Sequence, residues 1–227
     1  MTADISPVLI FSGKILLASF LTNLALGTWA GVYLARRDGF ASRVLDIVIS
    51  LPLVFPPIAL GFFLLLVFGR NSPLGRFLGN TLNLHVIFSA AGVFIAAFLA
   101  GFPLMVKSVS AAAAVIEPSI IEMACIQGAS PFQIALYVII PNLRMGVLSG
   151  LALSTARSLG EVGMTLMLGG NITGKTETLS LAIYNAVFEG NFSRAGYLSF
   201  IVALLAVLFF IAIQKFEKKD IKMPAVF

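Results

Sequence analysis

The sequence has few of the residues that build metal centres, disulfides or catalytic sites. Its 227 residues include one cysteine, Cys125, and one histidine, His85. A disulfide needs two cysteines, and metal clusters need several cysteine or histidine ligands. We therefore expect no internal disulfide, no metal site, no cofactor and no catalytic residue in this chain.

Charged residues are also scarce. They make up 11% of the sequence, against 59% hydrophobic residues, and the mean hydropathy is +1.02. Such a composition excludes an ordinary soluble domain. The formal net charge is +5, but the basic residues flank apolar segments, and there is no soluble basic domain with interleaved aromatic residues to hold a nucleic acid. The sequence predicts an integral membrane protein that contacts lipid and no nucleic acid.

Long apolar runs predict an all-α fold with five transmembrane helices in a single domain, residues 1–227. A helix needs about 20 residues to cross a hydrocarbon core roughly 30 Å thick. The predicted spans cover about residues 12–35, 46–69, 86–107, 143–168 and 195–215.

The second predicted span is interrupted by prolines, and a polar segment follows it. Pro52, Pro56 and Pro57 predict a kinked helix packed inside the bundle, because proline frees backbone carbonyls that lipid cannot satisfy. The kink is either a hinge or lining of a translocation route, or a purely structural feature. Residues 70–85, rich in Gly and Asn, are expected to form a polar loop.

Basic residues are distributed unevenly over alternate loops. One side holds Arg36, Arg37, Arg43, Lys107, Arg144, Lys215, Lys218, Lys219 and Lys222, and the other holds Arg70, Arg76, Lys175 and Arg194. Cytoplasmic loops carry the excess of lysine and arginine in membrane proteins. The pattern predicts the N-terminus outside and the C-terminus in the cytoplasm.

Residues 117–141 predict two short helices joined by a turn, which we call the elbow. Pro118 suits the first helical position, and Gly128 suits the left-handed residue that ends such a helix. Ser130 and Gln133 form a Ser-x-x-Gln capping box for a second helix that is expected to run toward Pro141. The predicted orientation places the elbow in the cytoplasm.

The fourth predicted span contains an opposite-charge pair. Arg157 and Glu161 lie four residues apart on one expected helical face. A single charge near the membrane centre costs roughly 2.5–3.5 kcal/mol on insertion scales, so the two are expected to neutralise each other inside the bundle. They either fix helix packing or, with Ser154, border the path or gate of a solute.

The segment GGNITGKT fits the G-x-x-x-x-G-K-[ST] pattern of a phosphate-binding loop through Gly169, Gly174, Lys175 and Thr176. That loop needs a buried strand before it and a helix after it in an α/β fold. Here a predicted transmembrane helix precedes it, and the charge pattern places it outside. We expect a tight outer turn, with Lys175 and Thr176 facing a docking protein or the incoming solute.

The elbow carries a family resemblance. Glu122, Ala124 and Gly128, followed at the expected distance by 138–141 (VIIP), resemble the E-A-A, three residues, Gly, nine residues, I-x-L-P signature of ATP-binding-cassette (ABC) importer permeases of type I. Met123 and Val138 depart mildly from the usual Ala and Ile. In that family the loop docks on a cytoplasmic ATPase subunit. The resemblance implies that ATP-driven movement is transmitted here through Glu122, Ala124, Gly128, Ala129, Ser130 and Phe132.

A narrower resemblance covers nearly the whole chain. Residues 156–187, with R-x-L-G-E-x-G and G-N-I-x-G-K-T, resemble molybdate-type oxyanion permeases, as do LPLVFPP at 51–57 and FPLM at 102–105. Residues 189–195 resemble tungstate permeases as readily, and sulfate permeases are more distant. The resemblance implies a homodimer in a bacterial or archaeal cell membrane, with two ATP-binding subunits inside and an oxyanion-binding protein outside. The alternative class is an ATP-independent anion channel.

Overall fold

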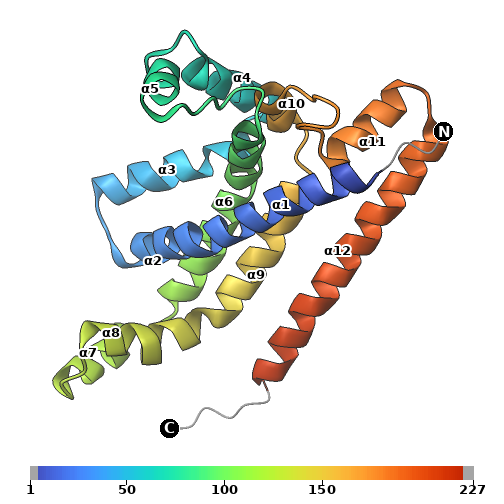
Figure 1. The fold of residues 1–227 in the computed structure, drawn as a ribbon. Helices are drawn as coiled ribbons and strands as arrows, with labels where there is room; N and C mark the ends of the chain where they lie inside the picture. Colours follow the sequence, from blue (N-terminus) through green and yellow to red (C-terminus); the bar gives the residue numbers. More distant parts are fainter. Residues whose placement is uncertain (1–4, 222–227) are drawn as a thin grey trace.

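The computed structural model describes residues 5–221, and these residues form helices joined by turns, with no β-strand among them (Figure 1). The helices, in chain order, are α1 (Ser6–Thr22), the π-helical turn η1 (Asn23–Gly27), α2 (Thr28–Arg36), α3 (Phe40–Val54), α4 (Pro57–Phe68), α5 (Pro73–Leu82), α6 (Ala90–Ala114), α7 (Pro118–Ile126), α8 (Pro131–Ile134), the π-helical turn η2 (Ala135–Ile139), α9 (Ile140–Leu159), α10 (Gly163–Gly169), α11 (Leu179–Phe188) and α12 (Phe192–Ile221). The predicted all-α membrane fold is confirmed.

Helix α6 is the centre of the bundle, and α9, α2, α1, α10 and α3 pack around it (Figure 1). Its buried residues are mostly small, as at Ala96, Ala97, Ala100 and Gly101. Small side chains let neighbouring helices approach closely, which favours helix association in lipid. A 25-residue helix of this hydropathy is long enough to cross a membrane.

The first helix is continuous from Ser6 to Arg36 over 31 residues, with a π-helical turn in its middle. Gly27 and Gly31 face α6 so closely that a Cβ atom on Gly27 would lie 2.5 Å from Met105 Cγ, and one on Gly31 would lie 2.7 Å from Val109 Cβ. These two glycines therefore fix how near the first helix lies to α6.

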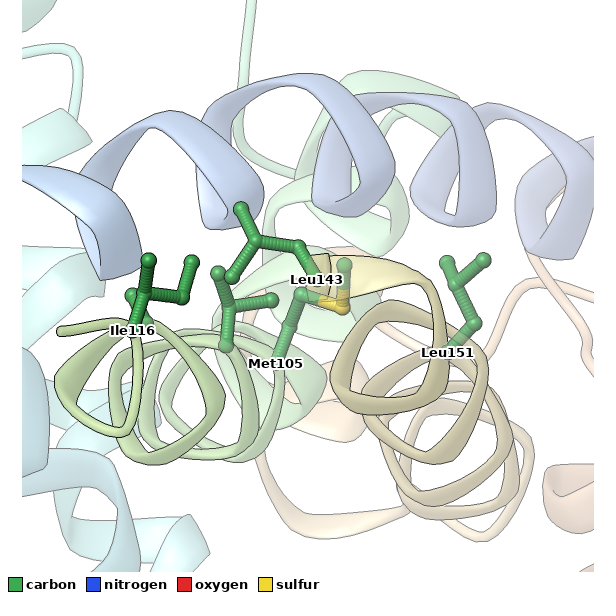
Figure 2. Close-up of a cluster of buried hydrophobic side chains, with 6 residues drawn as sticks. Met105, Ile116, Leu143 and Leu151 are labelled. Carbon is green, nitrogen blue, oxygen red and sulfur yellow. The ribbon is translucent and has the colours of Figure 1, made fainter. Parts of the chain in front are cut away.

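Helices α6 and α9 make the most extensive contact in the fold. A Cβ atom on Gly146 of α9 would lie 2.4 Å from Ala112 Cβ, and the Ser108 hydroxyl donates to the Gly146 carbonyl over 2.8 Å. A buried cluster fills the space beside this contact, with Met105, Ile116, Leu143 and Leu151 labelled in Figure 2. The C-terminal end of α6 and the start of α9 are thus one tightly packed unit.

Two elements differ from the sequence-based expectation between residues 46 and 85. The prolines interrupt the helix outright: α3 ends at Val54 and α4 begins at Pro57. The expected polar loop at 70–85 contains helix α5, whose N-cap Ser72 accepts from the Gly75 amide at 2.8 Å. Helices α4 and α5 are bent by 59° relative to each other, so the described residues hold four helices that can each cross a membrane, or five if this pair counts as one.

The helix boundaries around the fourth predicted span also differ. Helix α9 ends at Leu159 instead of continuing to 168, and α10 forms a separate short helix after the break. The loop that follows contains α11, which the sequence analysis did not predict. Helix α12 begins at Phe192 and is 30 residues long. Lys222 of the basic tail lies outside the described residues.

Candidate functional site

The turn of the elbow has the geometry that its sequence predicts. Gly128 has φ +82°, its amide donates to the Cys125 carbonyl at 3.0 Å, and the Ala129 amide donates to the Ala124 carbonyl at 3.0 Å. These two bonds form a Schellman motif, which satisfies the free carbonyls at the end of a helix. Ala124, Gly128 and Ala129 are therefore joined by one local backbone structure.

The second elbow helix starts at the predicted capping box. The Gln133 amide donates to Ser130 Oγ at 3.3 Å, and the Ser130 amide donates to Gln133 Oε1 at 2.8 Å. This helix runs toward Pro141, as the sequence predicts, and continues past it, unbroken from Pro131 to Leu159. The wider π-helical turn η2 ends at Ile139, two residues before Pro141, and accommodates the missing N–H of this proline. The second helix of the elbow is thus the first part of the same helix as α9, while α7 is separate from it (Figure 1).

The outer face of the elbow exposes large apolar side chains. Ile126 is 85% exposed, Phe132 is 75% exposed, and Glu122 is exposed as well. No atom outside its own neighbours lies within 4 Å of the position a Cβ would take on Gly128. Exposed apolar side chains gathered on one surface are typical of an interaction site.

The inner face of the elbow rests on the bundle. Ile121 of α7 and Ile139 of η2 pack against the cluster shown in Figure 2. A force applied to the elbow would therefore reach both α6 and α9, because their side chains form that cluster.

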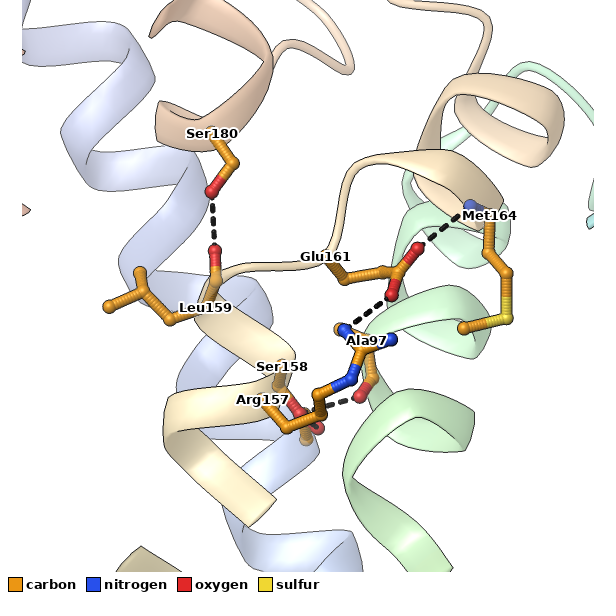
Figure 3. A network of polar contacts seen from close by, with 8 residues as sticks. Ala97, Arg157, Ser158, Leu159, Glu161, Met164 and Ser180 are labelled. Atoms are coloured by element: carbon orange, nitrogen blue, oxygen red, sulfur yellow. Dashed lines mark hydrogen bonds and ion pairs between the residues drawn. The ribbon is translucent and has the colours of Figure 1, made fainter. Parts of the chain in front are cut away.

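Arg157 and Glu161 form the predicted ion pair, but the helix ends between them (Figure 3). Arg157 Nη1 donates to Glu161 Oε2 at 2.7 Å, and the Met164 amide donates to Glu161 Oε1 at 2.8 Å. The Glu161 side chain is 1% exposed, while that of Arg157 is 32% exposed. The carboxylate therefore joins the end of α9 to the start of α10, and the expectation of a single continuous helical face is wrong.

Serine hydroxyls complete the break between α9 and α10. Ser180 Oγ of α11 donates to the Leu159 carbonyl at 2.5 Å, and Ser158 Oγ donates to the Ala97 carbonyl of α6 at 2.6 Å (Figure 3). The first bond satisfies a carbonyl at the end of α9 that would otherwise be costly in a membrane, and the second ties α9 to α6. The break is therefore held by defined side-chain contacts, and α6, α9, α10 and α11 meet there.

Ser154 has a packing position. It is fully buried, its hydroxyl donates to the Leu151 carbonyl of its own helix at 3.2 Å, and its carbonyl would lie 2.6 Å from a Cβ on Gly101 of α6. This position favours close helix contact over contact with a solute. Of the three residues predicted for a path or gate, the structure brings together Arg157 and Glu161.

The segment resembling a phosphate-binding loop has a different structure. Helix α10 precedes it, and the Thr176 hydroxyl, which is 0% exposed, donates to the Gly169 carbonyl at 2.7 Å and accepts from the Ile172 amide at 2.9 Å. The amides of Lys175 and Thr176 both donate to the Ile172 carbonyl. These groups are therefore engaged within the turn. The expectation that Thr176 faces outward is wrong, because its side chain holds the turn from inside, while Lys175 is exposed.

Sequence analysis missed a chain of buried polar side chains that reaches Ser158, at the break between α9 and α10. Asn23, in the π-helical turn of the first helix, is 1% exposed and donates to Ser19 Oγ at 3.2 Å, and Ser19 Oγ lies 3.3 Å from Ser158 Oγ. A lone asparagine in an apolar run was the available signal, since polar residues within a membrane usually face the protein interior. Among the side chains that the structure describes, no three of His, Cys, Asp or Glu form a group that could hold a metal ion.

Comparison with known proteins gives a family match over most of the chain. The family model described as "Binding-protein-dependent transport system inner membrane component" matches residues 24–219. A Bacillus subtilis protein named putative molybdenum transport system permease protein YvgM is 36% identical over 212 residues, covering 92% of this chain and 93% of its own.

Two further relatives and a solved structure agree with this match. The molybdenum transport system permease proteins ModB of Haemophilus influenzae and Escherichia coli are each 32% identical, covering 86% and 88% of this chain and 87% of their own. A solved structure titled "Inward facing conformations of the MetNI methionine ABC transporter" superposes with a TM-score of 0.69 at 18% identity, covering 94% of each chain. At this identity the structural similarity concerns the fold alone.

Proposed function

The chain belongs to the family of binding-protein-dependent transport system inner membrane components, and on that premise we propose that it carries molybdate. It is a multi-pass inner membrane permease of an ABC importer and has no catalytic role of its own. The observation that supports molybdate is the 36% identity over 92% of the chain to a relative named for molybdenum transport. Tungstate and, further away, sulfate are the alternatives, because all three are divalent tetrahedral anions.

Uptake measurements test the substrate. The chain is reconstituted with its ATP-binding subunit and its binding protein in liposomes, and uptake of labelled molybdate is measured against an excess of unlabelled tungstate or sulfate. The proposal expects ATP-dependent molybdate uptake that tungstate reduces and sulfate at the same concentration does not. Uptake of sulfate in preference to molybdate would contradict it.

The transport cycle proposed here uses a homodimer with two cytoplasmic ATP-binding subunits and an extracytoplasmic oxyanion-binding protein. The family description supports dependence on a binding protein, and the exposed apolar face of the elbow supports docking of another protein. ATP binding would draw the two ATP-binding subunits together and move the two elbows with them. Since the elbow continues into α9 and packs on α6, its movement would rearrange the bundle.

The proposed orientation has the N-terminus outside and the elbow and C-terminus in the cytoplasm. The excess of basic residues on the elbow side supports this arrangement. In the same arrangement the turn at 169–178 and α11 lie on the outer side, where the binding protein delivers the anion. Lys175, exposed in this turn, is then available to that protein or to the anion.

We assign the Arg157–Glu161 break to the gate of the translocation path. The partly exposed guanidinium can attract an anion, while Glu161 holds it in place and lowers its net charge, so that an anion is not retained too tightly. Ser154 is placed with the packing residues of this gate.

The competing class, an ATP-independent anion channel, makes a different prediction for the purified protein. A channel needs no partner for the elbow. Tagged chain extracted from membranes that also contain the ATP-binding subunit should bring that subunit down, and Phe132→Asp should reduce its recovery several-fold because a charge would then enter the apolar contact. Equal recovery of the ATP-binding subunit with the native chain and with Phe132→Asp would contradict the elbow as the docking surface.

A further inference from the structure

Two apolar cavities lie along the first helix, on the side where it meets α9. One, of about 460 Å³, lies between α1, α9 and α12 and includes Phe20 in its lining. The other, of about 440 Å³, is lined by residues of η1, α2 and α9, among them Leu24, Ala25 and Trp29. Phe20 and Leu24 are one helical turn apart, so the two cavities follow each other along the helix axis. We call the second cavity the α2–α9 groove.

Arg36 follows this groove at the end of α2. In a helix of 3.6 residues per turn, Ala25, Trp29 and Arg36 fall on one face, with Arg36 about 10 Å beyond Trp29 along the axis. Helical side chains lean toward the N-terminus of their helix, so the Arg36 side chain leans back toward the groove. Its neighbour Ala35 packs against the same buried cluster as Ile121 and Ile139 of the elbow, so the end of α2 and the base of the elbow share that cluster.

The guanidinium of Arg36 has buried donors without acceptors. Among the described residues, none accepts a hydrogen bond from its Nε or its Nη2, although both atoms are shielded from solvent. Arginine stays charged in proteins, and its planar fork matches a phosphate in a bidentate manner. Arg36 as a whole is half-buried, so an anion can approach its guanidinium from the surface and would offset the cost of the shielded donors that lack a partner.

Trp29 marks the depth of the groove in the membrane. It is 66% exposed and stacks on Tyr33, with ring centroids 5.7 Å apart. Tryptophan and tyrosine gather at the level of lipid headgroups, where an apolar ring meets polar surroundings. The apolar groove thus lies on the hydrocarbon side of Trp29, and Arg36 lies on the headgroup side.

We propose that the α2–α9 groove binds an anionic phospholipid, with an acyl chain along Ala25 and Leu24 and the phosphate on Arg36. The arrangement matches the ligand in order along the helix: apolar wall, interfacial aromatic ring, then a cation with free donors. Arg36 lies at the end of α2, which shares a buried cluster with the base of the elbow, so the bound lipid would support the joint between the elbow and the bundle. A soluble anion would use Arg36 but has no need of the apolar wall, and a second copy of this chain would bury the wall without supplying a phosphate.

Native mass spectrometry of the full transporter tests the proposal. The complex is incubated with an equimolar mixture of phosphatidylglycerol and phosphatidylcholine that carry the same acyl chains, and the retained lipids are counted. We expect phosphatidylglycerol to be retained on the order of tenfold over phosphatidylcholine, and Arg36→Gln to remove most of that preference. Arg43→Gln is the matched control, because Arg43 is an exposed basic residue on α3 away from the groove, and it should leave the preference unchanged.

Two further arms separate the alternatives. Ala25→Phe fills the groove and should lower phosphatidylglycerol retention, whereas glycerophosphoglycerol, which has the headgroup without the chains, should not compete. Competition by the bare headgroup, or the same loss with Arg43→Gln as with Arg36→Gln, would overturn the proposal. So would efficient cross-linking of two copies through Ala25→Cys in a Cys125→Ser background, since the partner chain would then occupy the groove.

Discussion

Arg157 Nη1 and Glu161 Oε2 lie 2.7 Å apart across the point where helix α9 ends. The same carboxylate caps the next helix through the Met164 amide. One side chain therefore neutralises a charge and organises a helix break inside the bundle. This double role makes the pair sensitive to small changes.

Glu161→Gln should destabilise the protein, because it leaves the Arg157 charge without its counter-ion in a largely buried setting. Breaking a fully buried pair costs about 3–5 kcal/mol, and since Arg157 is partly exposed we expect roughly 1–3 kcal/mol. The measurement is the thermal unfolding midpoint of the purified transporter. Arg157→Met combined with Glu161→Gln should recover part of the loss, and an unchanged midpoint in the single variant would show that the pair contributes nothing.

Gly146→Ala should weaken the contact between α6 and α9. The added Cβ would lie 2.4 Å from Ala112 Cβ, and neither atom belongs to a flexible side chain, so the helices must separate. Overpacking of this kind costs about 1–3 kcal/mol. Gly13→Ala is the control, because nothing lies within 4 Å of its Cβ position. Equal thermal midpoints for the two variants would refute a close contact at Gly146.

Gly128→Ala should uncouple the transporter while leaving it in the membrane. Gly128 has φ +82° and open space around it, so an alanine there meets no steric clash. It strains the backbone of the turn, at a cost of about 1–2 kcal/mol in conformational free energy. We expect a several-fold loss of uptake per ATP hydrolysed, and a larger loss for Gly128→Asp, which adds a charge to the docking surface. Gly196→Ala, in helix α12 with free space around it, should behave as the native protein. Normal coupling in both Gly128 variants would remove the elbow from the mechanism.

Lys175→Ala should leave the basal ATPase activity of the full transporter, measured without the binding protein, unchanged. The residues of this segment bond within their own turn, with Thr176 facing inward. A true phosphate-binding loop depends on its lysine to hold the phosphates of ATP, and its loss would abolish hydrolysis. The measurement is ATP hydrolysis by vesicles that contain the native transporter or the Lys175→Ala variant. A severe loss in the variant would indicate that this segment binds a nucleotide.

Local sequence signals predicted the elbow turn because its structure depends on neighbouring residues only. Gly128, Ser130 and Gln133 each have one strongly favoured role, and the structure gives each of them that role. The family resemblance of the same segment to ABC importer permeases was confirmed by the family match. The roles of Glu122 and Phe132 in coupling stay predictions, since they concern a partner.

The helix ends inside the apolar segments could not be predicted in the same way. Hydropathy does not distinguish a helix that continues from one that breaks and resumes, as at Leu159 and Gly163. The break depends on Glu161 reaching the Met164 amide and on Ser180 reaching the Leu159 carbonyl, and the second of these contacts comes from a distant part of the chain.

One cysteine can test directly whether the elbow is a cytoplasmic surface that docks an ATP-binding subunit. Cys125 is exposed in the elbow and is the single cysteine of the sequence. A membrane-impermeant maleimide should label it in inside-out vesicles and leave it unlabelled in right-side-out vesicles, and bound ATP-binding subunit should protect it. Thr173→Cys in a Cys125→Ser background should show the opposite sidedness. Labelling of Cys125 in intact right-side-out vesicles would place the elbow on the outer face and contradict its role as the docking surface for the ATP-binding subunit.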